Sequence, residues 1–229
     1  MTTIILNILC EGQTEEKFVK EVLRSHLPNT VCKTQILETN HKGKQRGGML
    51  SYQQVHRDLN RWMRSVMGRT SETHYFTTMV DFYRLPADFP SYADAMKQPN
   101  ASAKVATLEA AFGDDIQYTR FIPYIQLHEF EALVFCGLNH LKREYPKAAK
   151  KIDELDILLQ NTYAGNPEDI NNSVETAPSK RIIKALEKYY NYNKPKSGVS
   201  AVSQVGIDSL RKQCAHFNEW ITKLEKLQP

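Results

Sequence analysis

Short β-rich runs alternate with amphipathic helical stretches along residues 1–137, and this alternation constrains the fold more than any other feature. Such an order is typical of a mostly parallel sheet with helices on both faces. The β-rich runs are Thr3 to Cys10, Val31 to Leu37, His74 to Val80 and Tyr118 to Leu127. From residue 138 onward only helical patterns recur. We therefore predict an α/β core with a four-stranded sheet over residues 1–137, and a helical C-terminal extension over residues 138–229 packed on it.

Composition excludes several other classes of protein. Hydrophobic residues make up 41% of the chain, which is enough for a core and argues against general disorder. No apolar run approaches the ~20 residues that a membrane-spanning helix needs, and the N-terminus lacks the basic region of a signal peptide. The 4 cysteines lie far apart without a Cys-x-x-Cys pair, so a zinc knot is not expected. We expect a soluble cytoplasmic protein without membrane association.

Acidic residues follow the ends of three predicted strands. Glu11 follows the first strand, Asp81 ends the third, and Glu129 and Glu131 follow the fourth. In an open α/β sheet the carboxyl ends of parallel strands lie along one edge, and ligands bind there. Hard carboxylate oxygens suit Mg²⁺, with Mn²⁺ as a substitute. The pattern predicts a magnesium site at this edge; the alternative is that these acids simply face water.

The contribution of the fourth strand depends on local geometry. If residues 128–132 are helical, Glu129 and Glu131 point in different directions, and His128 shares a face with Glu131. If the segment is extended, Glu129 and Glu131 lie on the same side. Alternatively, one glutamate hydrogen-bonds backbone or pairs with an arginine. Glu15 either supports the site or lies in the first turn of a helix, where negative charge is favourable.

Two basic segments are candidates for phosphate contacts. Lys42, Lys44 and Arg46 lie in the Gly-rich segment 40–50, which we interpret as a flexible phosphate-contacting loop or as a solvated surface loop. Segment 191–200 is predicted to be a mobile loop. Tyrosines and lysines near it could stack on bases and hold phosphates, or pack as a helix end: Lys188, Tyr189, Tyr190, Tyr192, Lys194 and Lys196. The net charge of +4 lies wholly in residues 141–229, which favours a polyanionic substrate.

The run Ile8-Leu-Cys-Glu11-Gly-Gln-Thr-Glu15 resembles the opening motif of Toprim-like domains, found in overcoming-lysogenization-defect nucleases, primases and topoisomerases. Val80-Asp81-Phe-Tyr83 stands where those domains carry Asp-x-Asp. Three further motifs narrow the resemblance to the bacterial Toprim-like family called domain of unknown function 4276, over nearly the whole chain. They are Pro123-Tyr-Ile-Gln-Leu-His128-Glu-Phe-Glu131-Ala, Ala177-Pro-Ser-Lys180-Arg181 and His216-Phe-Asn218-x-Trp220.

The resemblance implies a compact Toprim core with a Mg²⁺ site. Glu11 matches the superfamily glutamate that binds metal or acts as general acid or base, and Asp81 matches the first aspartate of the metal-binding pair. Tyr83 replaces the second aspartate and is a poor Mg²⁺ ligand, so Glu129 or Glu131 is expected to supply the missing carboxylate. Similar Toprim proteins act beside ATPases in bacterial defence against phage.

We therefore predict a Mg²⁺-dependent, nuclease-like enzyme that cleaves phosphodiester bonds of DNA or RNA and acts in phage defence. Glu11 and Asp81 are the predicted catalytic residues. The alternative, which Tyr83 favours, is a non-catalytic Toprim-like partner subunit of an ATPase. A topoisomerase is not expected because no separate domain remains to deliver a tyrosine nucleophile.

Overall fold

A parallel sheet forms the centre of the computed structural model, which describes residues 2–41, 44–46, 48–170 and 175–229. Strand β1 (Thr3–Cys10) lies between β2 (Thr30–Ile36) and β5 (Glu72–Asp81). The short strands β6 (Phe121–Ile122) and β7 (Ile125–Gln126) both pair with β5, and every pair in this sheet is parallel. Six consecutive residues of β1 are buried, as expected for a strand covered on both faces. The predicted α/β class is confirmed.

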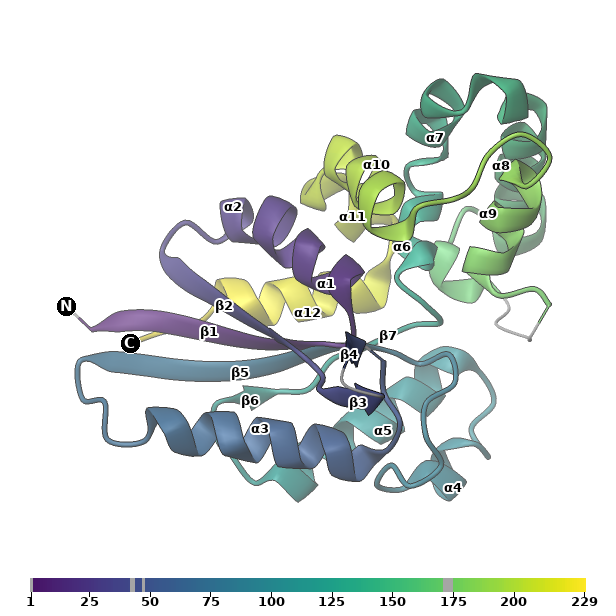
Figure 1. Cartoon of the computed structure of the whole chain (residues 1–229). Helices are drawn as coiled ribbons and strands as arrows, with labels where there is room; N and C mark the ends of the chain where they lie inside the picture. Colours follow the sequence, from purple (N-terminus) through teal and green to yellow (C-terminus); the bar gives the residue numbers. More distant parts are fainter. Residues whose placement is uncertain (1, 42–43, 47, 171–174) are drawn as a thin grey trace.

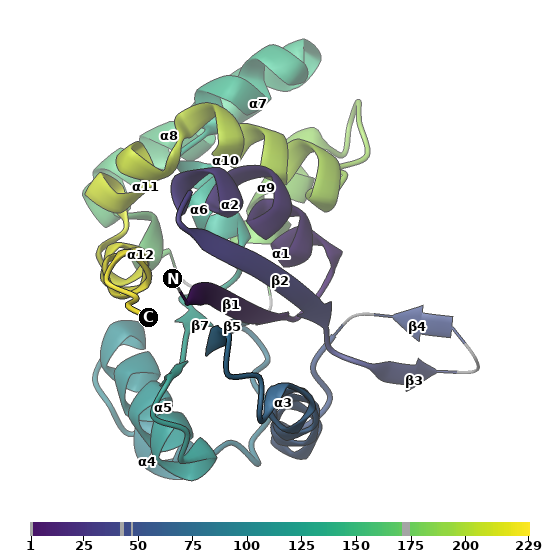
Figure 2. The same cartoon turned by 90° about the vertical axis from the view of Figure 1, so that its left-hand side faces the viewer.

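Helices cover both faces of the sheet (Figures 1 and 2). On one face lie α3 (Tyr52–Val66) and α5 (Ala101–Ile116), with the short α4 (Tyr92–Ala95) beside them. On the other face lie the continuous helical segment α1 (Gln13–Phe18), η1 (Val19–Leu23) and α2 (Arg24–His26), together with α12 (Ala215–Glu225). The last helix of the chain therefore packs on the sheet at β5, where the Trp220 indole N–H donates to Thr77 Oγ1 (Figure 2).

The remaining helices are α6 (Glu131–Phe135), α7 (Leu138–Glu144), η2 (Pro146–Ala148), α8 (Ala149–Tyr163), η3 (Pro167–Asp169), α9 (Pro178–Leu186), η4 (Lys194–Gly198), α10 (Val199–Val205) and α11 (Ile207–Gln213). Of these, α7, α8 and α9 stand at the upper right of Figure 1, beyond the carboxyl ends of the strands, whereas α10 and α11 lie above α1 and α12. No helix in the described ranges is long and apolar enough to cross a membrane.

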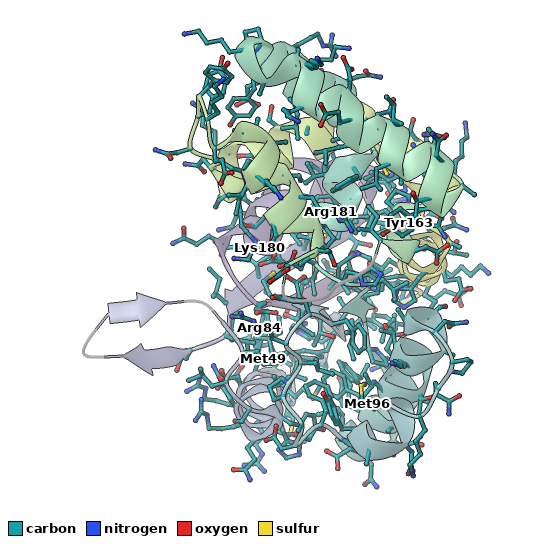
Figure 3. All side chains as sticks on the ribbon, turned by 90° about the vertical axis from the view of Figure 1, so that its right-hand side faces the viewer. Met49, Arg84, Met96, Tyr163, Lys180 and Arg181 are labelled. Atoms are coloured by element: carbon teal, nitrogen blue, oxygen red, sulfur yellow. The ribbon has the colours of Figure 1, made fainter. Side chains whose placement is uncertain are left out.

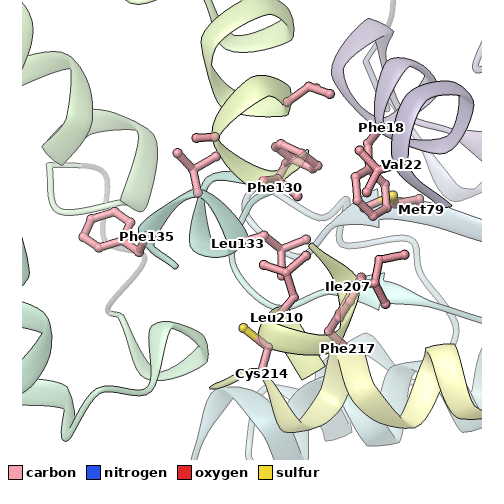
Figure 4. Close-up of a cluster of buried hydrophobic side chains, with 14 of the residues drawn as sticks. Phe18, Val22, Met79, Phe130, Leu133, Phe135, Ile207, Leu210, Cys214 and Phe217 are labelled. Atoms are coloured by element: carbon pink, nitrogen blue, oxygen red, sulfur yellow. The ribbon is translucent and has the colours of Figure 1, made fainter. Parts of the chain in front are cut away.

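One buried apolar cluster joins these helices to the sheet (Figure 4). Phe18 of α1 contacts the rings of Phe130 and Phe217 edge to face, with centroids 5.7 and 6.2 Å apart. Met79 of β5 and Leu210 of α11 belong to the same cluster. The extension thus packs on the core through shared hydrophobic burial. The division of the chain at residue 137 stays a prediction.

The fourth predicted strand is shorter than the sequence suggested. The expected run from Tyr118 to Leu127 forms two short strands with a break at Pro123 and Tyr124. Proline has no amide hydrogen for a sheet ladder. At the break, the Thr78 side chain makes the hydrogen bonds to the neighbouring backbone. Its hydroxyl donates to the Tyr124 carbonyl oxygen (2.8 Å) and accepts from the Tyr124 amide (3.1 Å).

Segment 40–50, interpreted as a loop, instead contains part of an antiparallel pair formed by β3 (Thr39–His41) and β4 (Lys44–Arg46). The prediction of a loop was wrong here because two three-residue polar strands carry no hydrophobic alternation. Lys42 lies outside the described residues, as do the side chains of Lys44 and Arg46. Their role in phosphate binding stays a prediction.

Candidate functional site

The carboxyl edge of the sheet brings Glu11 and Asp81 into direct contact. The Glu11 amide donates to the Met79 carbonyl oxygen (3.0 Å), so Glu11 stands just beyond the end of β1 and beside β5. Asp81 is the last residue of β5. Its backbone amide donates to Glu11 Oε2 at 2.9 Å. The strand-end pattern therefore located two neighbouring acids.

The segment after β7 reaches the same edge. Asp81 pairs with Gln126 in the register of β5 and β7, and the Phe130 amide donates to Asp81 Oδ1 (3.0 Å). His128 adopts a left-handed conformation with φ of 64°. Such a φ is unfavourable for a residue other than glycine and persists only where surrounding contacts hold it. One such contact is the Tyr83 amide, which donates to the His128 carbonyl oxygen at 2.7 Å.

Glu129 and Glu131 adopt different environments, because the helix α6 begins only at Glu131. Glu129 accepts two hydrogen bonds from Ser179 at the start of α9, one from its amide (2.9 Å) and one from its hydroxyl (3.0 Å). Glu131 pairs with Lys194, whose Nζ lies 3.1 Å from each carboxylate oxygen. The alternative that one glutamate hydrogen-bonds backbone is confirmed at Glu129, which accepts from the Ser179 amide. The cation that pairs with Glu131 is a lysine and not the expected arginine.

Burial and mutual repulsion raise the proton affinity of the carboxylates. Burial raises the pKa of Asp81 well above its ordinary value, and the charges of Glu11, Glu15 and Glu131 raise it further. Burial, reinforced by Glu11, raises the pKa of Glu15 to about 7. Burial also raises the pKa of Glu11 and of Glu131, although Lys194 opposes the shift at both.

Lys194 is the cation at the centre of these acids. Burial lowers its pKa, but Glu131, Glu129 and Asp81 raise it by a larger amount, so the net shift is upward. Glu11, Asp81, Glu129 and Glu131 interact electrostatically with its ammonium group, and Glu15 in turn interacts with Glu11 and Glu131, which makes five carboxylates in all. We call this set the acidic cluster. Its excess of negative charge and its hard oxygen donors fit a divalent cation such as Mg²⁺.

The resting contacts occupy many of the donor oxygens. Within the described ranges, no three His, Cys, Asp or Glu side chains are arranged so that they could hold a metal ion. Backbone amides, Ser179 and Lys194 bond to the carboxylates. Glu15, Glu129 and Glu131 are only 6%, 5% and 1% exposed, whereas Glu11 and Asp81 are partly exposed. Glu11 and Asp81 are therefore the least buried residues of the acidic cluster.

The two predicted supporting residues also have structural contacts. Glu15 Oε2 accepts from the Gly12 amide (2.8 Å) and so stabilises the start of α1. His128 is 2% exposed, and its Nε2–H donates to the carbonyl oxygen of Glu168 at 2.8 Å. Glu168 in turn accepts from the amides of His216 and Phe217 at the start of α12 (both 3.0 Å). His128 therefore links the edge of the sheet to the helix that covers it.

Sequence reasoning missed the roles of Ser179 and Lys194. Ser179 lies within the motif Ala177-Pro-Ser-Lys180-Arg181, which supported the family resemblance. The motif gave no indication that Ser179 bonds to Glu129. Lys194 was seen only as a member of a tyrosine and lysine group. Segment 191–200, predicted to be a mobile loop, contains the π-helix η4 and the start of α10.

Basic side chains flank the edge to which the strands point. Figure 3 views the molecule from that side and shows Lys180, Arg181 and Arg84 on it. Lys180 and Arg84 are exposed. The Arg181 side chain is partly buried, and its Nε–H donates a hydrogen bond to the Thr176 carbonyl oxygen (2.7 Å). An acidic centre bordered by exposed cations suits a substrate that carries phosphate groups along a chain.

The raised pKa of Glu15 predicts a pH-dependent stability. In the metal-free protein, its neutral form contributes stability that is fully present below pH 4.5 and is lost as pH rises through about 7. Glu15→Gln stays neutral and keeps an oxygen for the Gly12 amide. We expect equal stability at pH 4.5, and above pH 7 a gain on the order of 3 kcal/mol for the variant.

Urea unfolding of both proteins in EDTA across this pH range measures the difference. Glu154→Gln, at an exposed site on α8, serves as the control and should show no pH-dependent gain. A Glu15→Gln difference that stays constant with pH would contradict the raised pKa.

Comparisons with known proteins place the chain in a family. The profile of the family described as domain of unknown function 4276 matches residues 10–225. No significant match was found among proteins with curated descriptions or among solved structures.

Proposed function

The chain belongs to the family called domain of unknown function 4276, and from its acidic cluster we propose that it hydrolyses phosphodiester bonds of DNA or RNA with Mg²⁺. One observation carries the proposal. The ends of β1, β5 and β7, with the segments that follow β1 and β7, bring five carboxylates and Lys194 together at the edge where α/β sheets bind ligands. The relation to Toprim domains forms part of the proposal and rests on the sequence motifs.

Glu11 and Asp81 would hold the ion, because they are the least buried residues of the cluster and lie at two neighbouring strand ends. Their backbone bonds fix both side chains relative to the strand ends. Glu131 supplies the third carboxylate, since Tyr83 offers no hard anionic oxygen. When bound, Mg²⁺ activates a water molecule and neutralises charge on the phosphate oxygens.

Glu15 and Lys194 have further roles in the proposed reaction, one as a proton acceptor and the other as a partner of the phosphate charge. Glu15 has a pKa of about 7, which suits a group that accepts a proton near neutral pH. Lys194 already lies among the carboxylates, and its ammonium would pair with a phosphate oxygen of the substrate. Glu129 holds the start of α9 through Ser179 and so maintains the wall of the site.

The proposal extends to biological context through the motifs. Because similar Toprim proteins work beside ATPases against phage, an ATPase is the proposed protein partner and phage defence the proposed role. Both follow from the resemblance at Glu11 and Asp81 and are independent of the contacts described above.

A second candidate is a non-catalytic partner subunit of an ATPase. It is favoured by Tyr83 in place of the second aspartate, and by the carboxylate oxygens already bonded to Ser179 and Lys194. In that case the acidic cluster would be a structural feature, with protons or Lys194 balancing its charge.

A cleavage assay separates the two candidates. The purified full chain is incubated with labelled single-stranded and double-stranded DNA and RNA, in Mg²⁺, in Mn²⁺ and in EDTA. We expect cleavage of at least one substrate in Mg²⁺ or Mn²⁺ and none in EDTA. Intact substrates under every metal condition would leave the non-catalytic partner as the better account.

A further inference from the structure

An open pocket lies beside the acidic cluster, between the start of α1 and the segment that leads into η4. Its volume is about 710 Å³. Two stretches of chain form it: residues 12–14 with Lys17 from the N-terminal part, and residues 192–196 from the C-terminal part. Helix α1 contacts η4 directly, so the two walls belong to one packed unit.

The pocket is basic. Lys17, Lys194 and Lys196 line it, and none of its described lining residues is acidic. Gln13 and Asn193 add neutral polar groups to the wall. Lys17 Nζ is 3.8 Å from Glu21 Oε1 in an exposed pair, which contributes little and can be exchanged for another anion. The pocket thus offers positive charge and polar groups to an anionic ligand.

Lys194 connects the pocket to the proposed catalytic residues. It lines the pocket and also lies 3.1 Å from both oxygens of Glu131. On the opposite wall, Gly12 lines the pocket and directly follows Glu11 in the chain. A phosphate in the pocket would therefore lie next to the carboxylates that we propose to hold Mg²⁺.

The wall formed by residues 192–196 is held in place before any ligand binds. Asn193 Oδ1 accepts from the Lys196 amide (3.0 Å), and the Asn193 carbonyl oxygen accepts from the Ser197 amide (2.8 Å). The Ser197 hydroxyl donates to Glu144 Oε1 at 2.7 Å. Gly198 packs so tightly that a β-carbon there would lie 2.7 Å from the Tyr192 hydroxyl. A preorganised wall loses little conformational entropy on binding.

From this arrangement we propose that the pocket binds a backbone phosphate of a nucleic acid, next to the bond that the acidic cluster cleaves. This inference deepens the proposed function and rests on it for the identity of the ligand. The pocket is open to solvent and adjoins the acidic cluster at Gly12 and Lys194, which suits a polymer that continues past the pocket. Lys17 and Lys196 supply the phosphate contacts that do not involve the acidic cluster.

The test is a binding measurement in EDTA, so that it does not depend on cleavage. Fluorescence anisotropy of labelled oligonucleotides of DNA and RNA, single- and double-stranded, is followed over a range of salt concentrations. The double variant Lys17→Ala, Lys196→Ala should bind at least about 10-fold more weakly than the wild type. Its slope of log affinity against log salt should be smaller by about 1.4 to 1.8, because two phosphate contacts are lost.

A matched control removes the same charge elsewhere. Lys150 and Lys226 are exposed and do not line the pocket. The double variant Lys150→Ala, Lys226→Ala should keep the salt slope of the wild type and bind within about 2-fold of it. Equal weakening in both double variants would show a general charge effect and would overturn the proposed pocket.

Other outcomes separate the pocket from the chemistry. If fluorescently labelled ATP binds to the wild type but not to the Lys17→Ala, Lys196→Ala variant, while no oligonucleotide binds, the ligand is a mononucleotide and the polymer assignment is wrong. If the wild type binds no nucleic acid, the pocket proposal fails whatever the cleavage assay gives. If the pocket variant loses binding but the wild type cleaves nothing in Mg²⁺ or Mn²⁺, the pocket stands and the proposed hydrolysis fails.

Discussion

Asp81→Asn and Glu11→Gln should each lower the rate of Mg²⁺-dependent cleavage by at least about 100-fold, which corresponds to about 2.7 kcal/mol of lost transition-state stabilisation. Both changes remove a charged ligand but keep an oxygen in the side chain. In Asp81→Asn that oxygen still accepts from the Phe130 amide, and in Glu11→Gln it still accepts from the backbone amide of Asp81. The hydrogen bonds that shape the edge therefore persist, and the loss would report on the ion and not on the fold.

The melting temperature provides the control within the same variants. It should stay equal or rise in the metal-free proteins, because each change removes a charge that its neighbours repel. Asp114→Asn and Glu154→Gln make the same chemical changes at exposed positions and should leave cleavage unchanged. Cleavage within about 3-fold of the wild type in Asp81→Asn would place the chemistry elsewhere.

Trp220→Ala should destabilise the folded state by about 4 kcal/mol, the largest effect that we expect from a single core substitution. The Trp220 ring is 2% exposed and stacks on Tyr124, with centroids 4.2 Å apart. Its indole N–H donates to Thr77 Oγ1 in the sheet (2.9 Å). Truncation would leave a cavity between α12 and the sheet and would remove a buried hydrogen bond.

Urea unfolding followed by circular dichroism measures this effect. Ile157→Ala, at a side chain 58% exposed on α8, removes apolar volume outside the core and should cost less than about 0.5 kcal/mol. A loss of less than about 1 kcal/mol for Trp220→Ala would mean that α12 is not part of the cooperative core of the sheet.

The strands that are buried on both faces could be predicted closely from the sequence. The run from Thr3 to Cys10 matches β1 residue for residue, because an apolar stretch interrupted only by Asn7 leaves little choice of structure. The fourth run was less predictable: Pro123 interrupts the ladder, and only the threonine hydroxyl of a neighbouring strand restores it. The hairpin of β3 and β4 has no apolar pattern from which it could be predicted.

Some contacts of the candidate site could likewise be predicted from the sequence, and others could not. Glu11 and Asp81 could be placed together because parallel strands end at one edge, a rule that needs no tertiary contacts. The partners of Glu129 and Glu131 could not, since Ser179 and Lys194 are 50 and 63 residues away along the chain. No spacing rule links residues so far apart, and their meeting depends on how α9 and η4 pack against α6.

A crystal of the full chain soaked in Mn²⁺ tests the central claim most directly, because the anomalous signal of the ion locates it independently of any assay. The account predicts a single dominant peak within coordination distance of carboxylate oxygens of both Glu11 and Asp81, with Glu131 turned from Lys194 toward the ion. The same soak of an Asp81→Asn crystal should lose the peak. Fully formed wild-type crystals with no peak at this edge, or with a peak away from Glu11 and Asp81, would contradict the account and favour the non-catalytic partner.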